Sequence, residues 1–321
     1  MRAIVVSENG GPEVLVPTTV DDPRPGPDEV LVRVRATGVN FIDTYLRAGM
    51  YPTSLPYTPG SEGAGEVVDV GDDVPRSRIG ERVAWSDAPG SYAELVTVPA
   101  ARAVTVPDGV PDDQAASILL QGMTAHYLLD GSSHPDPGDT ALVHAGAGGV
   151  GLLLTQLAAA KGLRVISTVS TDAKEELSRK AGADHVLRYG DGLADRVRDL
   201  TDGAGVAVAY DGVGADTFEA SLAATRIRGT VVLFGAASGP VPPFDLQRLN
   251  KAGSLSVTRP TLAHFVADPE EFAWRAGDVM RGLSDGTLTL TVGQRFALDE
   301  AAEAHRALQA RSTVGSTVLA P

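Results

Sequence analysis

The first ~120 residues alternate short β-branched runs with clusters of proline and glycine. The clearest runs are EVLVRVRATGV at 29–39 and GEVVDVG at 65–71. Runs of this length, bounded by turn residues, predict β-strands. Because no long helical period interrupts them, we expect a β-rich N-terminal region.

A different pattern begins near Gly138, where apolar runs alternate with helical periods. The segments TALVHAG, GGVGLLLTQLAAAKG and LRVISTVS predict a strand, a glycine turn with a helix, and a second strand, which form a βαβ unit. The alternation continues with helices at 174–181, 192–200 and 216–224 and strands at 184–187, 206–210 and 230–234. The strands are nearly continuous apolar runs, as in a parallel sheet covered on both faces. The pattern therefore predicts an α/β fold with a doubly wound parallel sheet.

The alternation stops after Val257. The remaining pattern predicts a helix at 269–283 and short strands at 288–296 and 315–319 around a helix at 299–309. We expect this tail to rejoin the N-terminal domain, so that the doubly wound domain is an insertion. The predicted domains are 1–121 with 264–321, and 122–263.

Composition restricts the ligand and the partners. The chain has 321 residues, 43% of them hydrophobic, which is typical of a globular protein with two domains. A formal net charge of -14 offers no counter-charge to nucleic acid or to anionic membranes, so neither is expected as a partner and a small molecule is the expected ligand. With no signal-peptide pattern and no long apolar run, a cytoplasmic protein is expected.

The chain has no cysteine. This excludes disulfides, thiolate catalysis, iron–sulfur clusters and every zinc site that needs a thiolate. Of the six histidines, none pairs with another at metal-ligand spacing, and we interpret them as surface or core residues. No metal is therefore expected.

Gly146, Gly148 and Gly151 form the pattern GxGxxG directly after a predicted strand and at the start of a predicted helix. In that setting the first glycine permits a tight turn, the second lets the backbone approach a pyrophosphate, and the third lets the helix pack on the strand. The turn, including Gly149 and Val150, is therefore predicted to bind a dinucleotide.

The end of the next strand indicates which dinucleotide binds. Sites for NAD place an acidic residue ~20 positions after the glycines, but here that position falls near Val169 and Ser170. Ser170 can donate a hydrogen bond, and Lys174 supplies a cation, so NADPH is favoured over NADH. Asp172 leaves an alternative open, as the displaced acidic residue of an NADH site, or else as the N-cap of the following helix.

The chain resembles the medium-chain dehydrogenase/reductase superfamily, specifically its zinc-independent quinone oxidoreductase and zeta-crystallin branch. The resemblance covers essentially the whole chain and is carried by GGPEVL, GVNFIDTYLRAGMYP, LPYTPGSEGAGEV, HAGAGGVG and LNKAGSLSVTRPTL. It implies a GroES-like catalytic domain, built from the N-terminal region and the C-terminal tail, with a Rossmann domain inserted. It also implies an active site between the two domains.

The zinc-dependent members of the superfamily carry GHE where this chain has Gly60, Ser61 and Glu62, and a cysteine at Asn40 or a neighbour. Neither ligand type is present here. Without a Lewis acid, hydride delivery to an electron-poor acceptor is favoured over alcohol oxidation. Quinones and α,β-unsaturated carbonyls are such acceptors.

The resemblance also implies site residues. On the substrate side it implies Asn40, Tyr45, Tyr51, Gln121 and Thr124, of which Tyr45 and Thr124 would also meet the nicotinamide. Many relatives have a lysine in place of Gln121, so a cation at that position is not expected. For the cofactor it further implies Ser170, Lys174 and Tyr189 at the adenosine end, Phe234, Gly235, Val257 and Arg259 around the nicotinamide, and Arg311 as a phosphate contact. The alternative interpretation is that Tyr45 and Phe234 are packing residues and that the two arginines are solvated charges.

The expected function is an NADPH-dependent quinone reductase, with the proton supplied by water or by the hydroxyl of Tyr45 or Thr124. Two alternatives remain open: an NADPH-dependent enone or 2-alkenal reductase, and a non-catalytic NADPH-binding protein of the crystallin type. The strand segments 229–234 and 253–257 could pair across a two-fold axis, so a homodimer is expected.

Overall fold

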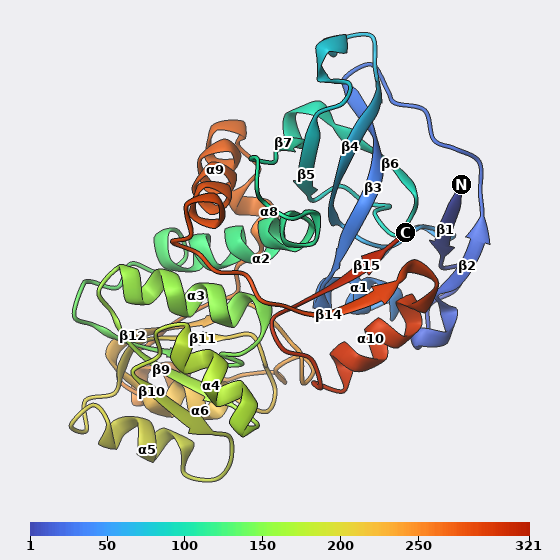
Figure 1. The fold of residues 1–321 in the computed structure, drawn as a ribbon. Coiled ribbons are helices and arrows are strands. Elements are labelled where there is room, and N and C mark those ends of the chain that lie inside the picture. The colour runs from blue at the N-terminus through green and yellow to red at the C-terminus, as the bar shows by residue number, and fades with distance from the viewer. The chain divides into compact units, whose positions relative to one another are not determined.

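The chain divides into two compact units in a computed structural model that describes residues 1–321 (Figure 1). The first unit contains residues 1–121 and 276–321, and the second contains residues 122–275. The C-terminal tail thus lies in the same unit as the N-terminal region. The second boundary falls within helix α9 (Pro269–Asp285), whereas the prediction placed it after residue 263.

The first unit is built on a mostly antiparallel sheet of seven strands in the order β14-β15-β3-β4-β5-β7, with β6 paired to β3. Their bounds are β3 (Glu29–Val39), β4 (Glu62–Val70), β5 (Arg82–Ser86), β6 (Leu95–Pro99), β7 (Val104–Thr105), β14 (Val292–Ala297) and β15 (Ser316–Ala320). A separate pair, β1 (Arg2–Val5) and β2 (Val16–Thr19), is antiparallel. Strand β3 has the predicted bounds, and its alternating valines are buried against β4, β5 and Trp85. The predicted β-rich region is confirmed.

The region also contains helices that the sequence pattern did not predict. Helix α1 (Phe41–Arg47) follows β3, and α2 (Asp112–Asp130) runs from the first unit into the second. Helix α1 has only seven residues, too few to show a helical period, and begins where Asn40 N donates to Asp43 Oδ2 at 2.8 Å. Helix α2 is buried along most of its length, so its sequence shows no polar stripe. Helix α10 (Ala301–Gln309) and four 3-10 turns, η1 (Pro12–Val14), η2 (Arg76–Arg78), η3 (Ala100–Arg102) and η4 (Leu298–Glu300), complete the unit.

The second unit is a six-stranded parallel sheet in the order β10-β9-β8-β11-β12-β13. The strands are β8 (Thr140–Val143), β9 (Arg164–Val169), β10 (His185–Arg188), β11 (Val206–Asp211), β12 (Thr225–Leu233) and β13 (Ser256–Thr258). The helices are α3 (Gly149–Ala160), α4 (Asp172–Lys180), α5 (Leu193–Asp199), α6 (Phe218–Ala224), α7 (Gln247–Lys251), α8 (Leu262–Phe265) and the first part of α9. The doubly wound fold is confirmed, and the strand order reverses between β8 and β11, where such folds bind ligands. No helix is long and apolar enough to cross a membrane.

Candidate active site

Asn40 joins strand β3 to helix α1 and lies within a buried chain of hydrogen bonds. Its Nδ2 donates to Glu62 Oε1 at 2.6 Å, and its Oδ1 accepts from Gln121 Nε2 at 3.1 Å. Gln121 Oε1 accepts from the Ser316 hydroxyl at 2.7 Å. The four side chains come from distant parts of the sequence and are all buried. The structure thus brings together Asn40 and Gln121, two of the predicted substrate residues.

Glu62 has the most unusual environment in this chain of hydrogen bonds. Its side chain is fully buried, and its second oxygen, Oε2, accepts the Leu120 N–H at 3.0 Å. Burial raises the pKa of Glu62 to about 8, although the hydrogen bonds from Asn40 and Leu120 lower it. The spacing of residues around Glu62 gave no reason to predict a site residue there. The one available signal was a carboxylate inside the segment GSEGAG, whose other residues are all small.

A second buried chain of hydrogen bonds ends at Asp43, whose Oδ2 is 3.1 Å from the Tyr92 hydroxyl. Tyr92 is also 3.1 Å from His305 Nε2, and Arg47 Nη1 is 3.1 Å from His305 Nδ1. Because a guanidinium can only donate, His305 Nδ1 accepts from Arg47, and its Nε2–H donates to Tyr92. Burial raises the pKa of Asp43 to about 7 and lowers the pKa of His305 to about 3. His305 is therefore a neutral core histidine, as interpreted from the sequence.

Helix α1 carries Tyr45, whose ring lies 6.0 Å from the ring of Tyr51 in an edge-to-face arrangement. Phe41 packs on the other side, with its centroid 6.3 Å from that of Tyr45. Tyr45 is half-buried and Tyr51 is 38% exposed, so neither is enclosed in the core. These two predicted substrate residues therefore form one aromatic surface that begins directly after Asn40.

Gln121 and Thr124 lie on helix α2, three residues apart, and so project from the same face of that helix. Both are buried. Both ends of the Gln121 amide form hydrogen bonds, the nitrogen to Asn40 and the oxygen to Ser316, and the nitrogen keeps a second N–H.

The three glycines of the turn between β8 and α3 differ in how much room each has for a side chain. A Cβ on Gly146 would lie 1.7 Å from Ser167 Oγ, and one on Gly151 would lie 2.3 Å from the Ala145 carbonyl oxygen. A Cβ on Gly148 would meet only that carbonyl, at 3.3 Å. The left-handed residue of the turn is Ala145, with φ 53°, so Gly146 is required by packing and not by its dihedral angles. Gly148 is thus the least crowded of the three, as expected of the glycine that approaches a pyrophosphate.

Helix α3 begins immediately after this turn without a side-chain cap. Gly148 is its N-cap and has no side chain to accept from the first backbone N–H groups. Those groups, which include Gly149 and Val150, have no partner within the helix. An uncapped N-terminus of this kind favours an anion, so the residues fit a bound pyrophosphate.

A buried polar network, absent from the predicted site, supports the turn. Ser221 donates to Asp211 Oδ2 at 2.7 Å, so the contact of 3.0 Å between Ser221 Oγ and His144 Nε2 has histidine as the donor. His144 Nδ1 then accepts from the Thr168 hydroxyl at 2.9 Å. Burial lowers the pKa of His144, which keeps the ring neutral. The ring of Tyr189 stacks on His144 with centroids 6.1 Å apart.

Tyr189 also holds the turn directly. Its hydroxyl oxygen accepts from the backbone N–H of Ala145 at 2.8 Å. A predicted adenosine-end residue therefore contacts the glycine turn, and its ring is half-buried.

The carboxyl end of β9 carries the residues predicted to select NADPH. Ser170 is exposed, and Lys174 lies half-buried in the first turn of α4. The N-cap of α4 is Thr171, whose Oγ1 accepts from the Lys174 N–H at 3.3 Å. The interpretation of Asp172 as the N-cap is therefore wrong, because the helix begins one residue earlier and its cap is the threonine hydroxyl.

Arg188 explains what Asp172 does instead. Its Nη2 lies 2.5 Å from Asp172 Oδ1 and 2.8 Å from Glu175 Oε2. Arg188 ends β10 and is the register partner of Val169 in β9, so it lies beside the strand end that precedes Ser170. Two carboxylates near this end are therefore paired with a cation. Because Asp172 is paired with Arg188, the interpretation of Asp172 as the acidic residue of an NADH site is disfavoured.

The remaining predicted cofactor residues lie at the ends of β12 and β13 and before β15. A Cβ on Gly235 would lie 2.3 Å from the Gly212 carbonyl oxygen, and one on Gly212 would lie 2.8 Å from the ring of Phe234. Phe234 and Gly235 thus pack against the residue that follows β11. Val257 and Arg259 are both exposed. Arg311 is exposed in the first unit and has φ 55°.

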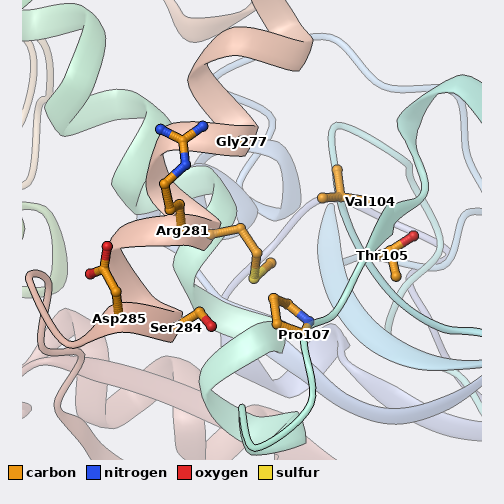
Figure 2. Close-up of a pocket in the computed structure, with 8 residues that line it drawn as sticks. Val104, Thr105, Pro107, Gly277, Arg281, Ser284 and Asp285 are labelled. Carbon is orange, nitrogen blue, oxygen red and sulfur yellow. The ribbon is translucent and has the colours of Figure 1, made fainter.

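A surface hollow of about 420 Å³ lies elsewhere in the first unit, between β7 and the second half of α9 (Figure 2). Its lining includes Val104, Pro107, Met280 and Arg281. None of the predicted site residues lines it. The hollow therefore has no part in the proposed chemistry.

Comparisons with known proteins agree with this geometry. Residues 26–108 match the alcohol dehydrogenase GroES-like domain, and residues 149–276 match the zinc-binding dehydrogenase family. A quinone oxidoreductase of Pseudomonas aeruginosa is 47% identical over 323 residues, which cover 100% of this chain and 99% of that protein. The chain belongs to the quinone oxidoreductase family of the medium-chain dehydrogenase/reductase superfamily. The predicted resemblance is confirmed.

Two further relatives have names that mention a cofactor or a substrate. A mycobacterial protein solved in complex with NADPH is 52% identical, with a TM-score of 0.97 and coverage of 100% of both chains. A 2-haloacrylate reductase of Burkholderia is 39% identical over 330 residues, which cover 100% of this chain and 99% of that protein. The first is similar in fold along its whole length, and the second is named for the reduction of a 2-haloacrylate.

Proposed function

We infer that the chain is an NADPH-dependent quinone reductase. The observation that carries this inference is the open, uncapped glycine turn, in which Gly148 leaves room for a pyrophosphate and α3 offers free N–H groups. The names of the relatives support the rest, because one is a quinone oxidoreductase and another was solved with NADPH.

NADPH, when bound, supplies the hydride. We propose that Gly149 and Val150 bind the pyrophosphate through their backbone N–H groups. Ser170 and Lys174 bind the 2′-phosphate, and Arg188 neutralises the two carboxylates beside it. The nicotinamide end would be held by the loops after β11, β12 and β13, and Arg311 would contact a phosphate; the residues proposed there are Phe234, Gly235, Val257 and Arg259.

On the substrate side, we propose that the aromatic surface of Tyr45 and Tyr51 holds the quinone ring. Asn40 and Gln121 bind its oxygen atoms through their amide groups, and Thr124 lies one turn further along α2. The quinone gains a hydride and a proton and becomes the quinol, while NADPH becomes NADP⁺. The proton comes from water or from the hydroxyl of Tyr45 or Thr124, because a quinol is acidic enough to need no strong acid.

We propose that the reaction needs no zinc. Zinc in proteins is bound by cysteine, histidine and carboxylate side chains, and the chain has no cysteine. Ser61, together with Asn40 or a neighbour, occupies the positions that carry ligands in zinc-dependent members of the superfamily, and the amide nitrogen and oxygen of Asn40 both bond to other side chains. The name of the zinc-binding dehydrogenase family, which matches residues 149–276, therefore does not imply a zinc site in this chain. Activity should survive treatment with 1,10-phenanthroline, and loss of activity that added zinc restores would overturn this point.

The function is tested by measuring NADPH oxidation with 1,4-benzoquinone as acceptor. We expect saturable turnover with NADPH and weaker turnover with NADH. An NADPH oxidation rate no higher than that without protein, for both 1,4-benzoquinone and 9,10-phenanthrenequinone, would refute the proposal.

A second candidate is reduction of an activated carbon–carbon double bond, which the 2-haloacrylate reductase relative favours. Here hydride goes to the β-carbon and a proton to the α-carbon, so a protonating tyrosine would matter more. Comparing 2-alkenals and haloacrylates with quinones separates the two. If the alkene is the true substrate, Tyr45→Phe should reduce alkene turnover more than quinone turnover.

We also propose a homodimer. Strand β13 is an edge of the six-stranded sheet, so one side of its backbone is available for pairing. Val257 on that strand is exposed, and Ile227 on the neighbouring strand β12 is 74% exposed. Two copies could pair β13 with β13 and cover these side chains. Sedimentation at micromolar concentration should give a dimer, and Ile227→Asp should shift it to monomer.

A further inference from the structure

Glu62 is the acceptor at which the buried chain of hydrogen bonds ends. Ser316 donates to Gln121, Gln121 donates to Asn40, and Asn40 donates to Glu62. Each amide offers its oxygen to one neighbour and its nitrogen to the next, so the orientation of one amide fixes the other. Because an ionised carboxylate can only accept, Glu62 sets the direction of the whole chain of bonds.

The Glu62 carboxylate is held in place from several sides. Its Oε2 accepts from Leu120 N, and the Thr37 hydroxyl donates to the backbone oxygen of Glu62 at 2.7 Å. A Cβ on Gly38 would lie 2.3 Å from Glu62 Oε1. The glycine thus leaves the space that the carboxylate fills, and the carboxylate cannot turn away from Asn40 without colliding with the backbone of β3 or losing Leu120.

Few charges balance this carboxylate. Its two hydrogen-bond donors, Asn40 and Leu120, are neutral. Asp43 on α1 is the ionisable neighbour, and its charge further raises the pKa of Glu62. Beyond Asp43 the hydrogen bonds lead to Tyr92 and then to neutral His305 on α10, and they reach the cation Arg47 through both of these side chains. With its pKa raised to about 8, Glu62 is present in both protonation states at mildly alkaline pH.

Protonation of Glu62 would change the hydrogen bonds that it can form with its neighbours. A protonated carboxyl has a hydrogen to donate, and Asn40 can accept it if its amide turns over, placing Oδ1 toward Glu62. Asn40 Nδ2 then donates to Gln121, whose amide also turns over and donates to the Ser316 hydroxyl oxygen. Each bond of the chain can be remade in the opposite direction, because a hydroxyl and an amide both donate and accept.

We propose that Glu62 is a positioning residue whose protonation state selects the direction of this chain, and with it the donor or acceptor groups that Asn40 and Gln121 present to the acceptor substrate. The ionised form, which matches the observed bonds, is the competent one. This inference rests on the proposed function, since it requires Asn40 and Gln121 to meet the quinone.

The experiment is the pH dependence of kcat and KM for 1,4-benzoquinone, followed by NADPH absorbance between about pH 6.5 and 9, around the raised pKa of Glu62. The wild-type kcat should rise with pH through about 8, because the ionised form is competent. In Glu62→Gln, kcat should fall about tenfold, the value of one misdirected hydrogen bond, and the inflection should disappear. The dissociation constant for NADPH should stay within about twofold, because the glycine turn belongs to the other unit.

Glu66→Gln is the matched control. Glu66 lies on the same strand, but it is exposed and pairs with Arg35 at the surface, so its removal should leave kcat and the pH profile unchanged. If Glu62→Gln does not fold, Glu62→Asp provides the test, since it retains a titratable carboxylate and should retain an inflection with a lower kcat.

Four results are decisive. A flat wild-type profile across this range, or a Glu62→Gln enzyme with the kcat, KM and inflection of the wild type, would overturn the inference while leaving the quinone reductase function intact. Loss of the inflection in Glu62→Gln alone, with NADPH binding preserved, would support it. Absence of quinone turnover in the wild type would refute the proposed function itself.

Discussion

Gly148→Ala should separate cofactor binding from folding. The backbone at Gly148 has φ -80° and ψ 169°, which alanine adopts without strain, and the nearest atom to an added Cβ is the Ala145 carbonyl oxygen at 3.3 Å. The methyl group would instead occupy the open side of the turn, where we place the pyrophosphate. The substitution therefore changes the proposed site and little else.

The magnitudes follow from a comparison with Gly146→Ala. At Gly148, alanine replaces glycine as N-cap of α3 and should cost at most about 1 kcal/mol, or roughly 2–4 °C in Tm. At Gly146 the new methyl would lie 1.7 Å from Ser167 Oγ in a fully buried position, and such overpacking costs about 1–3 kcal/mol or more. The loss of one or two backbone contacts to the pyrophosphate in Gly148→Ala should weaken NADPH binding by about 10- to 100-fold.

The assay combines thermal unfolding without nucleotide and titration of NADPH by fluorescence. Gly148→Ala should unfold near the wild-type temperature and bind NADPH poorly, whereas Gly146→Ala should unfold well below it. Wild-type affinity for NADPH in Gly148→Ala would contradict the placement of the pyrophosphate at this turn. An equal loss of stability in the two variants would contradict the steric difference between Gly146 and Gly148.

Two other predictions concern charge. Arg188→Gln leaves Asp172 without its cation and Glu175 paired with Arg179 alone, so the preference for NADPH over NADH should fall about tenfold. Arg179→Gln, which removes only an exposed partner of Glu175, is the control, and an unchanged ratio of the two dissociation constants in Arg188→Gln would contradict the assignment. Stability should fall as pH rises from about 6.5 to 8.5, because the raised pKa values of Asp43 and Glu62 mean that the folded chain holds protons which the unfolded chain has released. Below about 6.5 the lowered pKa of His305 opposes this trend, since the unfolded chain then binds a proton that the folded chain does not, so Tm should change less steeply with pH there. A Tm that rises from pH 6.5 to 8.5 would contradict the burial of the two acids.

The sequence predicted those parts of the fold that have a strong local pattern. Strand β3 was placed at its observed bounds because alternating valines face the core. Strand β12 begins at Thr225, earlier than the predicted residue 230, because its first half is the polar segment TRIRG, which shows no hydrophobic run. Within that segment only Thr225 has a register partner in β11, on the far side of an irregularity in the pairing. Helix α2 was missed because burial on most sides removes the polar stripe that identifies a helix.

The glycine turn could be predicted because its spacing follows from local geometry. The partners of charged side chains could not. Arg188 reaches Asp172 only because β10 and β9 are parallel neighbours whose carboxyl ends meet at one edge. Aligning the ends of consecutive predicted strands would have indicated this ion pair. Glu62 and His144 depend on side chains from three or four elements, and no spacing along the chain shows those contacts.

The most direct test of the central claim is a single-turnover measurement with chelator-treated protein. NADPH is first bound to the protein under anaerobic conditions. The complex is then mixed rapidly with 1,4-benzoquinone, and the oxidation of NADPH is followed by absorbance. We expect a fast phase that saturates with quinone, is unaffected by 1,10-phenanthroline, and is greatly weakened in Gly148→Ala at the same NADPH concentration. NADPH oxidation at the rate seen without protein, or a fast phase that appears only when zinc is added, would contradict it.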